Sequence, residues 1–291
     1  MKRMPARSEQ APPALRVRTL GQVEVWVAGR PAIWHAHTAE ELFFYLLSYP
    51  EGRSKGEILE TLWGLDPDPV ANNRFRVTVF RIRSALNNPE AIQEDHGRYR
   101  LAEEILHSTD LYDFYQALAQ GHHATGEAAR LESFRRAISL YRGDYLPGFS
   151  TNWVSQAREE HKAAYVQALL EVALIYHDRE DWRATAEYLE RALKADPYIG
   201  ENYHQRLMWC LAAMGDRYGA IEHYRRFVKF LHEELGDSPM PETRALAEHI
   251  KQGNPILPYH EVWSLNAKAP SSFHPELLSA IPGSKAENPQ T

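Results

Sequence analysis

A helical pattern that recurs with a fixed offset is the feature that most constrains how this chain can fold. Tyr176, Trp182, Leu189, Ala192 and Pro197 align at a constant offset of 35 residues with Leu211, Arg217, Tyr224, Phe227 and His232. The small residue Ala220 has Thr185 at its matching place, and a weaker copy runs from Ala128 to Tyr141. One helical hairpin cannot bury its own apolar face, so at least three stacked units are expected. The pattern predicts an α-solenoid of roughly 140 residues.

The repeat spacing is similar to that of the tetratricopeptide repeat, whose two antiparallel helices recur with a period of about 34 residues. From Leu111 to Ile250 the sequence carries no strand signal, and Gly or Pro marks only the helix ends. The densest local motif of this half is YRGDY, from Tyr141 to Tyr145. We interpret it as a helix C-terminus with a glycine stop and aromatic packing.

The N-terminal part follows a different pattern, in which short alternating segments come before capped helices. In residues 15–33, apolar residues alternate with polar ones around Gly21 and Gly29, which predicts a short antiparallel β-meander. Thr38 is the expected N-cap of a first helix that ends before Pro50.

A second helix and a hairpin are predicted on either side of an arginine-rich segment. Ser54 and Glu57 form a capping-box pattern at the start of a helix that runs to Gly64, and the loop of residues 65–70 follows it. Residues 91–101 read as two short strands around a turn at His96 and Gly97.

The arginine-rich segment of residues 72–86, NNRFRVTVFRIRSAL, carries four arginines and no acidic residue, although the whole chain has a net charge of −6. As a helix with about 100° per residue, it places apolar side chains on one side and mixed groups on the other. The apolar side holds Phe75, Val79, Ile82 and Leu86, and the mixed side holds Asn73, Val77, Phe80, Arg81 and Ser84. Arginine, amide, hydroxyl and apolar groups on one face suit a DNA major groove. The competing interpretation is an ordinary solvated helix face.

Three helices followed by a β-hairpin is the order of a winged helix-turn-helix, whose third helix enters the groove while the hairpin touches the backbone alongside. The predicted fold class is therefore mainly α with a small β part: an N-terminal winged helix-turn-helix followed by an all-α tetratricopeptide-like solenoid. We expect a disordered leader over 1–13, a winged-helix DNA-binding domain over 14–107, the helical domain over 108–252 and a mostly disordered tail over 253–291.

Composition excludes several classes of protein. The chain has no apolar run of about 18 residues, so no membrane span is expected. Its first residues lack the apolar core of a signal peptide, which predicts a cytoplasmic protein. The single cysteine, Cys210, has a helical apolar neighbourhood and is expected to be a buried small side chain. No nucleophile with a base, no carboxylate cluster and no phosphate loop points to an enzyme, and neither a metal nor another cofactor is implied.

The order of the parts resembles the Streptomyces antibiotic regulatory protein (SARP) family, in which a winged helix of the response-regulator output type precedes a bacterial transcriptional activator domain. The resemblance runs from Leu15 to Ile250 and is carried by LRVRTLGQVEVWVAGRP, ELFFYLLSYPEGRSKGEILETLW, NNRFRVTVFRIRSAL, SLYRGDYLPG and HYRRFVKFLHEELGDSPMPETRALAEHI. It implies a sequence-specific activator that binds direct repeats in double-stranded promoter DNA and contacts RNA polymerase. The wing tip departs from the family's Gly-x-Gly-Tyr arrangement, because Arg98 stands between Gly97 and Tyr99.

Four residues are candidates for contacts with the bases. Arg81 projects from the middle of the outward face, and in the resemblance it matches a position that reads bases. A bidentate contact to guanine is the commonest specific contact of an arginine. Val77 suits a thymine methyl group, and Thr78 or Asn73 suits a base edge or a phosphate.

The other basic residues suit the DNA backbone. Arg74, Arg76 and Arg83 flank the groove face and are expected on phosphate oxygens, which fix register without reading sequence. Arg83 could equally pair with an acid of its own domain. Arg98 at the hairpin could enter the minor groove or hold a phosphate, and a plain turn residue is the alternative.

The main alternative function is a tetratricopeptide-like scaffold or ligand-sensing protein whose winged module serves protein contacts only. Self-association on DNA is left open, and so is an effector, either a small molecule or a protein, on the helical domain. The histidines at 35 and 37 and at 122 and 123 lack the further ligands of a metal site and are expected to be structural or solvated.

Overall fold

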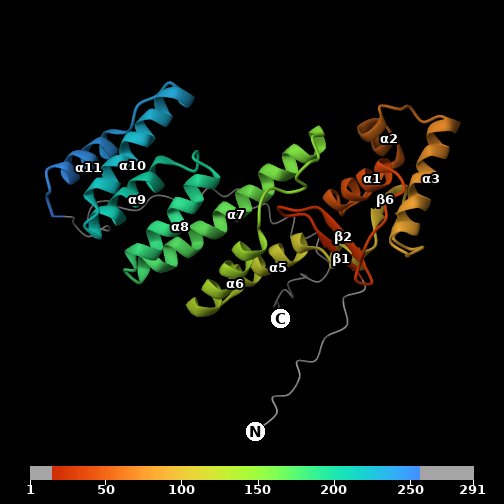
Figure 1. Ribbon diagram of the computed structural model, residues 1–291, viewed down its shortest axis with the longest axis horizontal. Coiled ribbons are helices and arrows are strands. Elements are labelled where there is room, and N and C mark those ends of the chain that lie inside the picture. Colours follow the sequence, from red (N-terminus) through yellow and green to blue (C-terminus); the bar gives the residue numbers. More distant parts are fainter. Residues whose placement is uncertain (1–14, 256–291) are drawn as a thin grey trace, which may run out of the picture. The chain divides into compact units, whose positions relative to one another are not determined.

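The computed structural model describes residues 15–255, and the expected leader and nearly all of the expected tail lie outside them (Figure 1). The described chain forms two compact units. One consists of residues 15–116 and 140–159, and the other of residues 117–139 and 160–255. The fold is mainly helical with two small sheets, as the sequence predicted.

The first unit begins with an antiparallel sheet of three strands, β1 (Leu15–Arg18), β2 (Glu24–Val27) and β3 (Arg30–Pro31), in that order. Val17 pairs with Val25 across the sheet, and both side chains are buried. The predicted β-meander is confirmed.

Three helices follow the first sheet: α1 (His37–Ser48), α2 (Lys55–Trp63) and α3 (Pro69–Ala85). α1 supplies the centre of the core through side chains with no exposed surface, namely Leu42, Phe43, Phe44 and Leu46. The prediction that Thr38 caps this helix is wrong. The helix begins two residues earlier, with Ala36 at the N-cap position, and Ala36 forms no side-chain cap.

The caps of the next two helices set their limits. In α2, the predicted capping box is present: Ser54 Oγ accepts from Glu57 N at 3.2 Å, and Ser54 N donates to Glu57 Oε2 at 2.7 Å. The helix ends at Gly64, whose φ of 59° lies in the left-handed region. In α3, Asp68 caps the first turn and Pro69 fills the position that tolerates proline. α3 therefore takes in two residues that the sequence assigned to the preceding loop.

A second sheet stands beside these helices. β5 (Ile92–Asp95) and β6 (Arg98–Leu101) form the predicted hairpin around His96 and Gly97, both with positive φ. β4 (Arg53–Ser54) pairs with β6, so the sheet has the order β4-β6-β5. This third strand was not predicted.

Residues 140–159 return to complete the first unit. Gly21 N donates to the carbonyl oxygen of Asp144 at 3.0 Å, next to the turn that follows β1. Tyr145 is fully buried, and its hydroxyl lies 2.8 Å from Ser48 Oγ of α1. The helix does end just before YRGDY, at Leu140, and Tyr145 is packed as expected, but Gly143 is not the helix stop, because its φ lies outside the left-handed region. The segment runs along the first sheet after its helix has ended.

Two backbones come unusually close at this contact. A Cβ atom on Gly143 would lie 3.0 Å from Gly21 Cα, and one on Gly21 would lie 2.8 Å from the carbonyl carbon of Arg142. Gly21 also has a φ of 82°, which side chains other than hydrogen rarely adopt. The approach therefore requires glycine on both sides.

The second unit is helical and shows the predicted repeat. Two helices precede it: the short α4 (Glu103–Leu106), and α5 (Asp110–His123), which continues from the first unit into the second. The remaining elements are α6 (Glu127–Leu140), α7 (Asn152–Asp178), α8 (Trp182–Ala195), α9 (Glu201–Ala213), α10 (Arg217–Phe230), the short π-helix η1 (Leu231–Leu235) and α11 (Pro241–Lys251) (Figure 1). Asp181 caps α8 and Asp216 caps α10, at the predicted offset. The matched small residues Thr185 and Ala220 are both buried.

Candidate nucleic-acid interface

One face of α3 is fixed to the core of the first unit. Phe75, Val79 and Ile82 are buried, as the helical spacing predicted. Phe75 also packs edge-on against Tyr99 of β6, with the ring centroids 4.7 Å apart. Because this face is anchored, the rotation of the helix about its axis is fixed, and the opposite face lies in solvent.

The solvent face of α3 has apolar and amide groups at its centre and arginines at its edges. At about 100° per residue, the order around this exposed arc is Arg76, Phe80, Asn73, Ser84, Val77, Arg81 and Arg74. Phe80 is 69% exposed and Val77 is 38% exposed. Exposed apolar groups between positive charges give a surface that can make both van der Waals contacts and ionic contacts.

Arg81 occupies an edge of the exposed arc rather than its middle. It is half-buried and lies roughly 70° from the centre of the arc at about 100° per residue. The prediction that it projects from the middle is wrong, because Asn73 and Ser84 stand there. Within residues 15–255, neither Arg81 nor Arg76 has an ion pair or a side-chain hydrogen bond. Both charges are therefore available to a partner.

Thr78 is turned into the protein. Its side chain is 1% exposed, and its hydroxyl donates to the carbonyl oxygen of Arg74 at 2.8 Å. The predicted contact of Thr78 with a base edge or a phosphate is therefore wrong. The position lies roughly 130° from the centre of the exposed arc at about 100° per residue, on the side of the core.

The other two arginines of α3 have partners within the first unit. Arg83 Nη2 donates to the carbonyl oxygen of Ile92 at 2.8 Å and so ties α3 to β5. Within residues 15–255 Arg83 forms no ion pair with an acid, whereas its contact with a phosphate stays a prediction, because the bond to Ile92 uses only one of its donors. The guanidinium of Arg74 stands 4.6 Å from the ring centroid of Trp63 and remains exposed.

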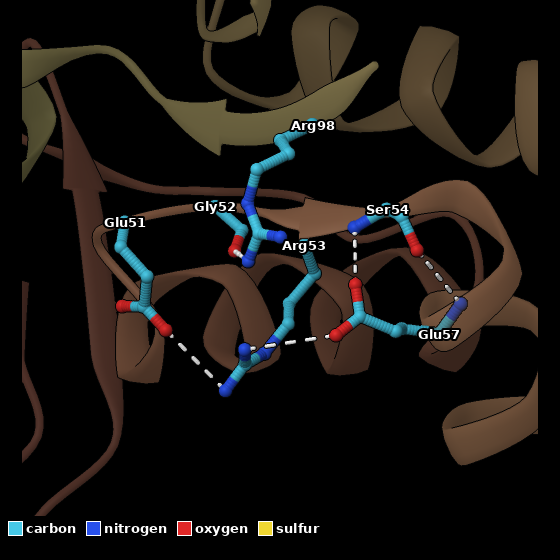
Figure 2. Close-up of polar contacts among 6 residues, drawn as sticks. All are labelled: Glu51, Gly52, Arg53, Ser54, Glu57 and Arg98. Carbon is cyan, nitrogen blue, oxygen red and sulfur yellow. Dashed lines mark hydrogen bonds and ion pairs between the residues drawn. The ribbon is translucent and has the colours of Figure 1, made fainter. Parts of the chain in front are cut away.

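Arg98 points back into the first unit (Figure 2). Its Nη2 atom donates to the carbonyl oxygen of Gly52 at 2.7 Å. This bond holds β6 to the turn between α1 and β4. The predicted roles of Arg98 in the minor groove or on a phosphate stay predictions, because this bond uses only one donor of the guanidinium.

A cluster of charges fixes the neighbouring strand (Figure 2). Arg53 Nη2 lies 3.3 Å from Glu51 Oε1, and Arg53 Nη1 lies 3.7 Å from Glu57 Oε1. The Arg53 guanidinium also covers the Tyr49 ring at 3.8 Å. Hydrogen bonds from Ser54 lower the pKa of Glu57, so its carboxylate stays charged. The cluster therefore positions β4 and the start of α2 beside the hairpin.

Two exposed residues lie outside the set that the sequence assigned to DNA contacts. Phe80 was placed on the outward face but received no role, and the signal was a large apolar side chain out of phase with the buried ones. Arg100 is exposed on β6, two residues after Arg98. The pattern RYR contained both arginines, but only packing separates the bound one from the exposed one.

Cys210 is buried in α9, as predicted, and burial raises the pKa of its thiol to about 12. Across residues 15–255, no three His, Cys, Asp or Glu side chains are grouped so as to hold a metal ion. None of the helices in that range has the length and apolar character needed to cross a membrane.

Comparison with known proteins finds regulatory relatives. Residues 109–251 match the family model of the bacterial transcriptional activator domain. Regulatory protein AfsR of Streptomyces coelicolor is 28% identical over 87% of this chain and 26% of its own length. Regulatory protein DnrI of Streptomyces peucetius is 25% identical over 68% of this chain and 77% of its own length. AfsR of Streptomyces griseus is 25% identical over 81% of this chain and 24% of its own, so the chain spans about a quarter of the AfsR relatives.

A solved structure has the same fold. Mycobacterium tuberculosis EmbR, in complex with a low-affinity phosphopeptide, superposes with a TM-score of 0.67 and 22% sequence identity, covering 84% of this chain and 66% of that one. The matched helical domain and the regulatory relatives together support a place for this chain in the Streptomyces antibiotic regulatory protein family.

Proposed function

We propose that this chain regulates transcription by binding specific DNA sequences through α3, with the β5–β6 hairpin as a second contact. The observation that carries the proposal is the exposed arc of α3, where unpaired Arg76 and Arg81 flank apolar and amide groups. A major groove admits a helix and presents thymine methyl groups and base acceptors to such side chains. The net charge of −6 favours a confined contact over general coating of nucleic acid.

Each group on the arc has a role that fits its place. Asn73 and Arg81 suit hydrogen bonds to base edges, and the exposed Val77 and Phe80 suit thymine methyl groups. Arg76, at the opposite edge from Arg81, suits a phosphate. Phosphate contacts fix the register of the protein on the duplex, whereas base contacts select the sequence.

The remaining parts of the proposal follow from family membership. The regulator activates transcription, binds direct repeats in promoters and contacts RNA polymerase, with self-association occurring on the DNA. The test is transcription in vitro with the host's RNA polymerase on a template that carries the selected site. A rise in transcript on adding the full chain supports activation, and a fall shows repression instead.

The base-reading role is tested with the full chain and a site obtained by selection from random oligonucleotides. We expect Arg81→Ala to reduce discrimination between this site and single-base variants by about 5- to 150-fold, since one bidentate contact contributes about 1 to 3 kcal/mol. Arg76→Ala should weaken all sequences alike and lower the salt dependence of binding by about one unit of slope. Fluorescence anisotropy at several salt concentrations measures both effects.

The matched control is Arg135→Ala, an exposed arginine of α6, which should leave affinity and specificity unchanged. Unchanged discrimination in Arg81→Ala would remove that residue from base reading. If selection recovers no preferred sequence at all, the winged unit does not read DNA, and a scaffold that contacts proteins becomes the better account.

A further inference from the structure

A pocket in the second unit is lined by residues of α8, α9 and α10. Its volume is about 430 Å³, and its apolar walls include Leu193, Leu207, Phe227 and Phe230. Pockets for small molecules hold about 300 to 1,000 Å³ and combine a mostly apolar lining with a few polar groups. The size and lining therefore suit a compact organic molecule.

Two stacked histidines give the pocket a flat, uncharged wall. His204 Nδ1 lies 3.1 Å from His223 Nε2, and His204 Nε2 lies 3.3 Å from the carbonyl oxygen of Pro197. Because a carbonyl only accepts, His204 Nε2 carries the proton, and Nδ1 accepts from His223. The Phe227 ring stacks on His204 with centroids 3.9 Å apart at 24°. These two rings cover one another and are only 5% and 4% exposed, so they form a rigid base beneath the pocket.

Two cations stand at this pocket without partners. Lys194 of α8 and Arg226 of α10 line it, are exposed, and form no ion pair or side-chain hydrogen bond within residues 15–255. Other basic residues nearby are paired: Arg225 lies 3.6 Å from Glu222, for example. Glu190 is the acidic residue of the lining, so one net positive charge remains beside neutral imidazoles.

We propose that this pocket binds a small amphipathic anion, with a flat apolar body of one or two rings and a single carboxylate or phosphate. The body lies in the apolar pocket between α8 and α10, and the anionic group is bound by Lys194 and Arg226. Charge selects the class of ligand: a cationic molecule would be repelled by the two unpaired cations, and a neutral one would gain no ionic contact from them. The site is independent of the DNA-binding proposal, because its occupancy is measured without DNA.

The test uses the full chain and three probes of one shape: naphthalene-2-carboxylate, 2-naphthalenemethanol and 2-naphthylmethylammonium. Calorimetric titration should show the carboxylate binding at least about tenfold more tightly than the alcohol, since a charge-assisted hydrogen bond contributes about 1.5 to 3 kcal/mol. The ammonium probe should not bind measurably. A phosphate group is tested with naphthyl phosphate in place of the carboxylate. The anion that binds with the higher affinity identifies the anionic group that the site prefers.

Variants locate the probe. Arg226→Ala and Lys194→Ala should each weaken carboxylate binding by about 3- to 10-fold, whereas Arg225→Ala, one position away and outside the lining, should not change it. Leu207→Trp should block the pocket, and the circular dichroism of that variant shows whether the helices persist. Equal binding of all three probes, no binding by any, or carboxylate affinity unchanged in both charge variants would overturn the proposal.

Discussion

The arginines of α3 carry the same charge in the sequence but have different surroundings in the fold. Arg83 donates to a strand carbonyl, Arg74 stacks on Trp63, and Arg76 and Arg81 have no partner within residues 15–255. Helical periodicity predicts which side of a helix a residue faces. It does not predict where a long side chain ends, because the guanidinium reaches groups on other elements that only tertiary packing places nearby.

Five predicted DNA contacts lie on accessible surface with no competing hydrogen bond: Asn73, Arg74, Arg76, Val77 and Arg81. Their roles on DNA stay predictions. Thr78 shows the limit of the approach. The hydroxyl of a threonine between the buried and exposed faces of a helix can donate to the carbonyl oxygen four residues earlier. The packing of neighbouring elements then determines whether that side chain is buried or exposed.

The His204 and His223 pair predicts a pH dependence of stability. Burial lowers the pKa of His204 to about 4 and that of His223 to about 3, whereas both titrate near 6.5 in an unfolded chain. Below pH 6.5 the unfolded state therefore binds more protons. The stabilisation is present above pH 6.5 and is lost as the pH falls toward the folded pKa values. Each histidine should remove up to about 1.4 kcal/mol of unfolding free energy per pH unit.

Urea denaturation of the full chain between about pH 7 and about pH 5 measures this loss. His223→Gln should make the unfolding free energy less sensitive to pH over that window. The exposed His232→Gln serves as the matched control and should keep the slope of the unmodified chain. Equal slopes in all three proteins would show that the buried pair does not control acid stability.

At the scale of elements, the sequence correctly predicted the features that depend on contacts between residues close together in the chain. The capping box of α2, its glycine end and the turn at His96 and Gly97 are formed by residues close in sequence, and all were predicted. β4 was missed because it has two residues and no alternating pattern. It exists through pairing with β6, where Arg53 faces Tyr99 and Ser54 faces Arg98.

Arg98→Met should loosen the pairing of β4 with β6. The substitution keeps the aliphatic stem but removes the bond to Gly52 O, and hydrogen bonds from charged groups contribute about 1.5 to 3 kcal/mol. Hydrogen exchange of the full chain should show faster exchange of the backbone amides in these two strands.

Arg100→Met on the same strand is the control, because Arg100 is exposed and should not affect exchange. If both variants exchange at the same rate as the unmodified chain, Arg98 does not hold the two strands together.

At the scale of the whole molecule, the helical repeat and the order of winged elements were predicted, and the fold class is confirmed. The route of residues 140–159 was not. Periodicity describes each helix against its sequence neighbours, whereas Tyr145 packs against Ser48 across almost a hundred positions. The division at residues 107 and 108 into DNA-binding and activator domains stays a prediction about function, and the compact units follow a different division.

Gly21→Ala should destabilise the first unit. The new methyl carbon would lie 2.8 Å from the Arg142 carbonyl carbon, and the φ of 82° is unfavourable for alanine. Left-handed strain alone costs about 1 kcal/mol or more, and the clash adds to it. We expect a fall of several degrees in the melting temperature of the full chain, followed by calorimetry.

Gly126→Ala is the control, since nothing lies within 4 Å of a Cβ atom there and its φ is not in the left-handed region. A melting temperature that falls equally in both variants would show that loss of glycine, rather than the close approach of the two backbones, causes the effect.

Residues 140–159 belong to the matched activator domain by sequence and to the winged unit by packing. This double membership limits how the gene can evolve by recombination. Suppose that a crossover near codon 108 joined this winged helix to a relative's activator domain. The relative's counterpart of residues 140–159 would then have to pack against α1 and the turn at Gly21. The two halves of such regulators should therefore be inherited together, and functional chimaeras should require that the donor's segment and the recipient's sheet match.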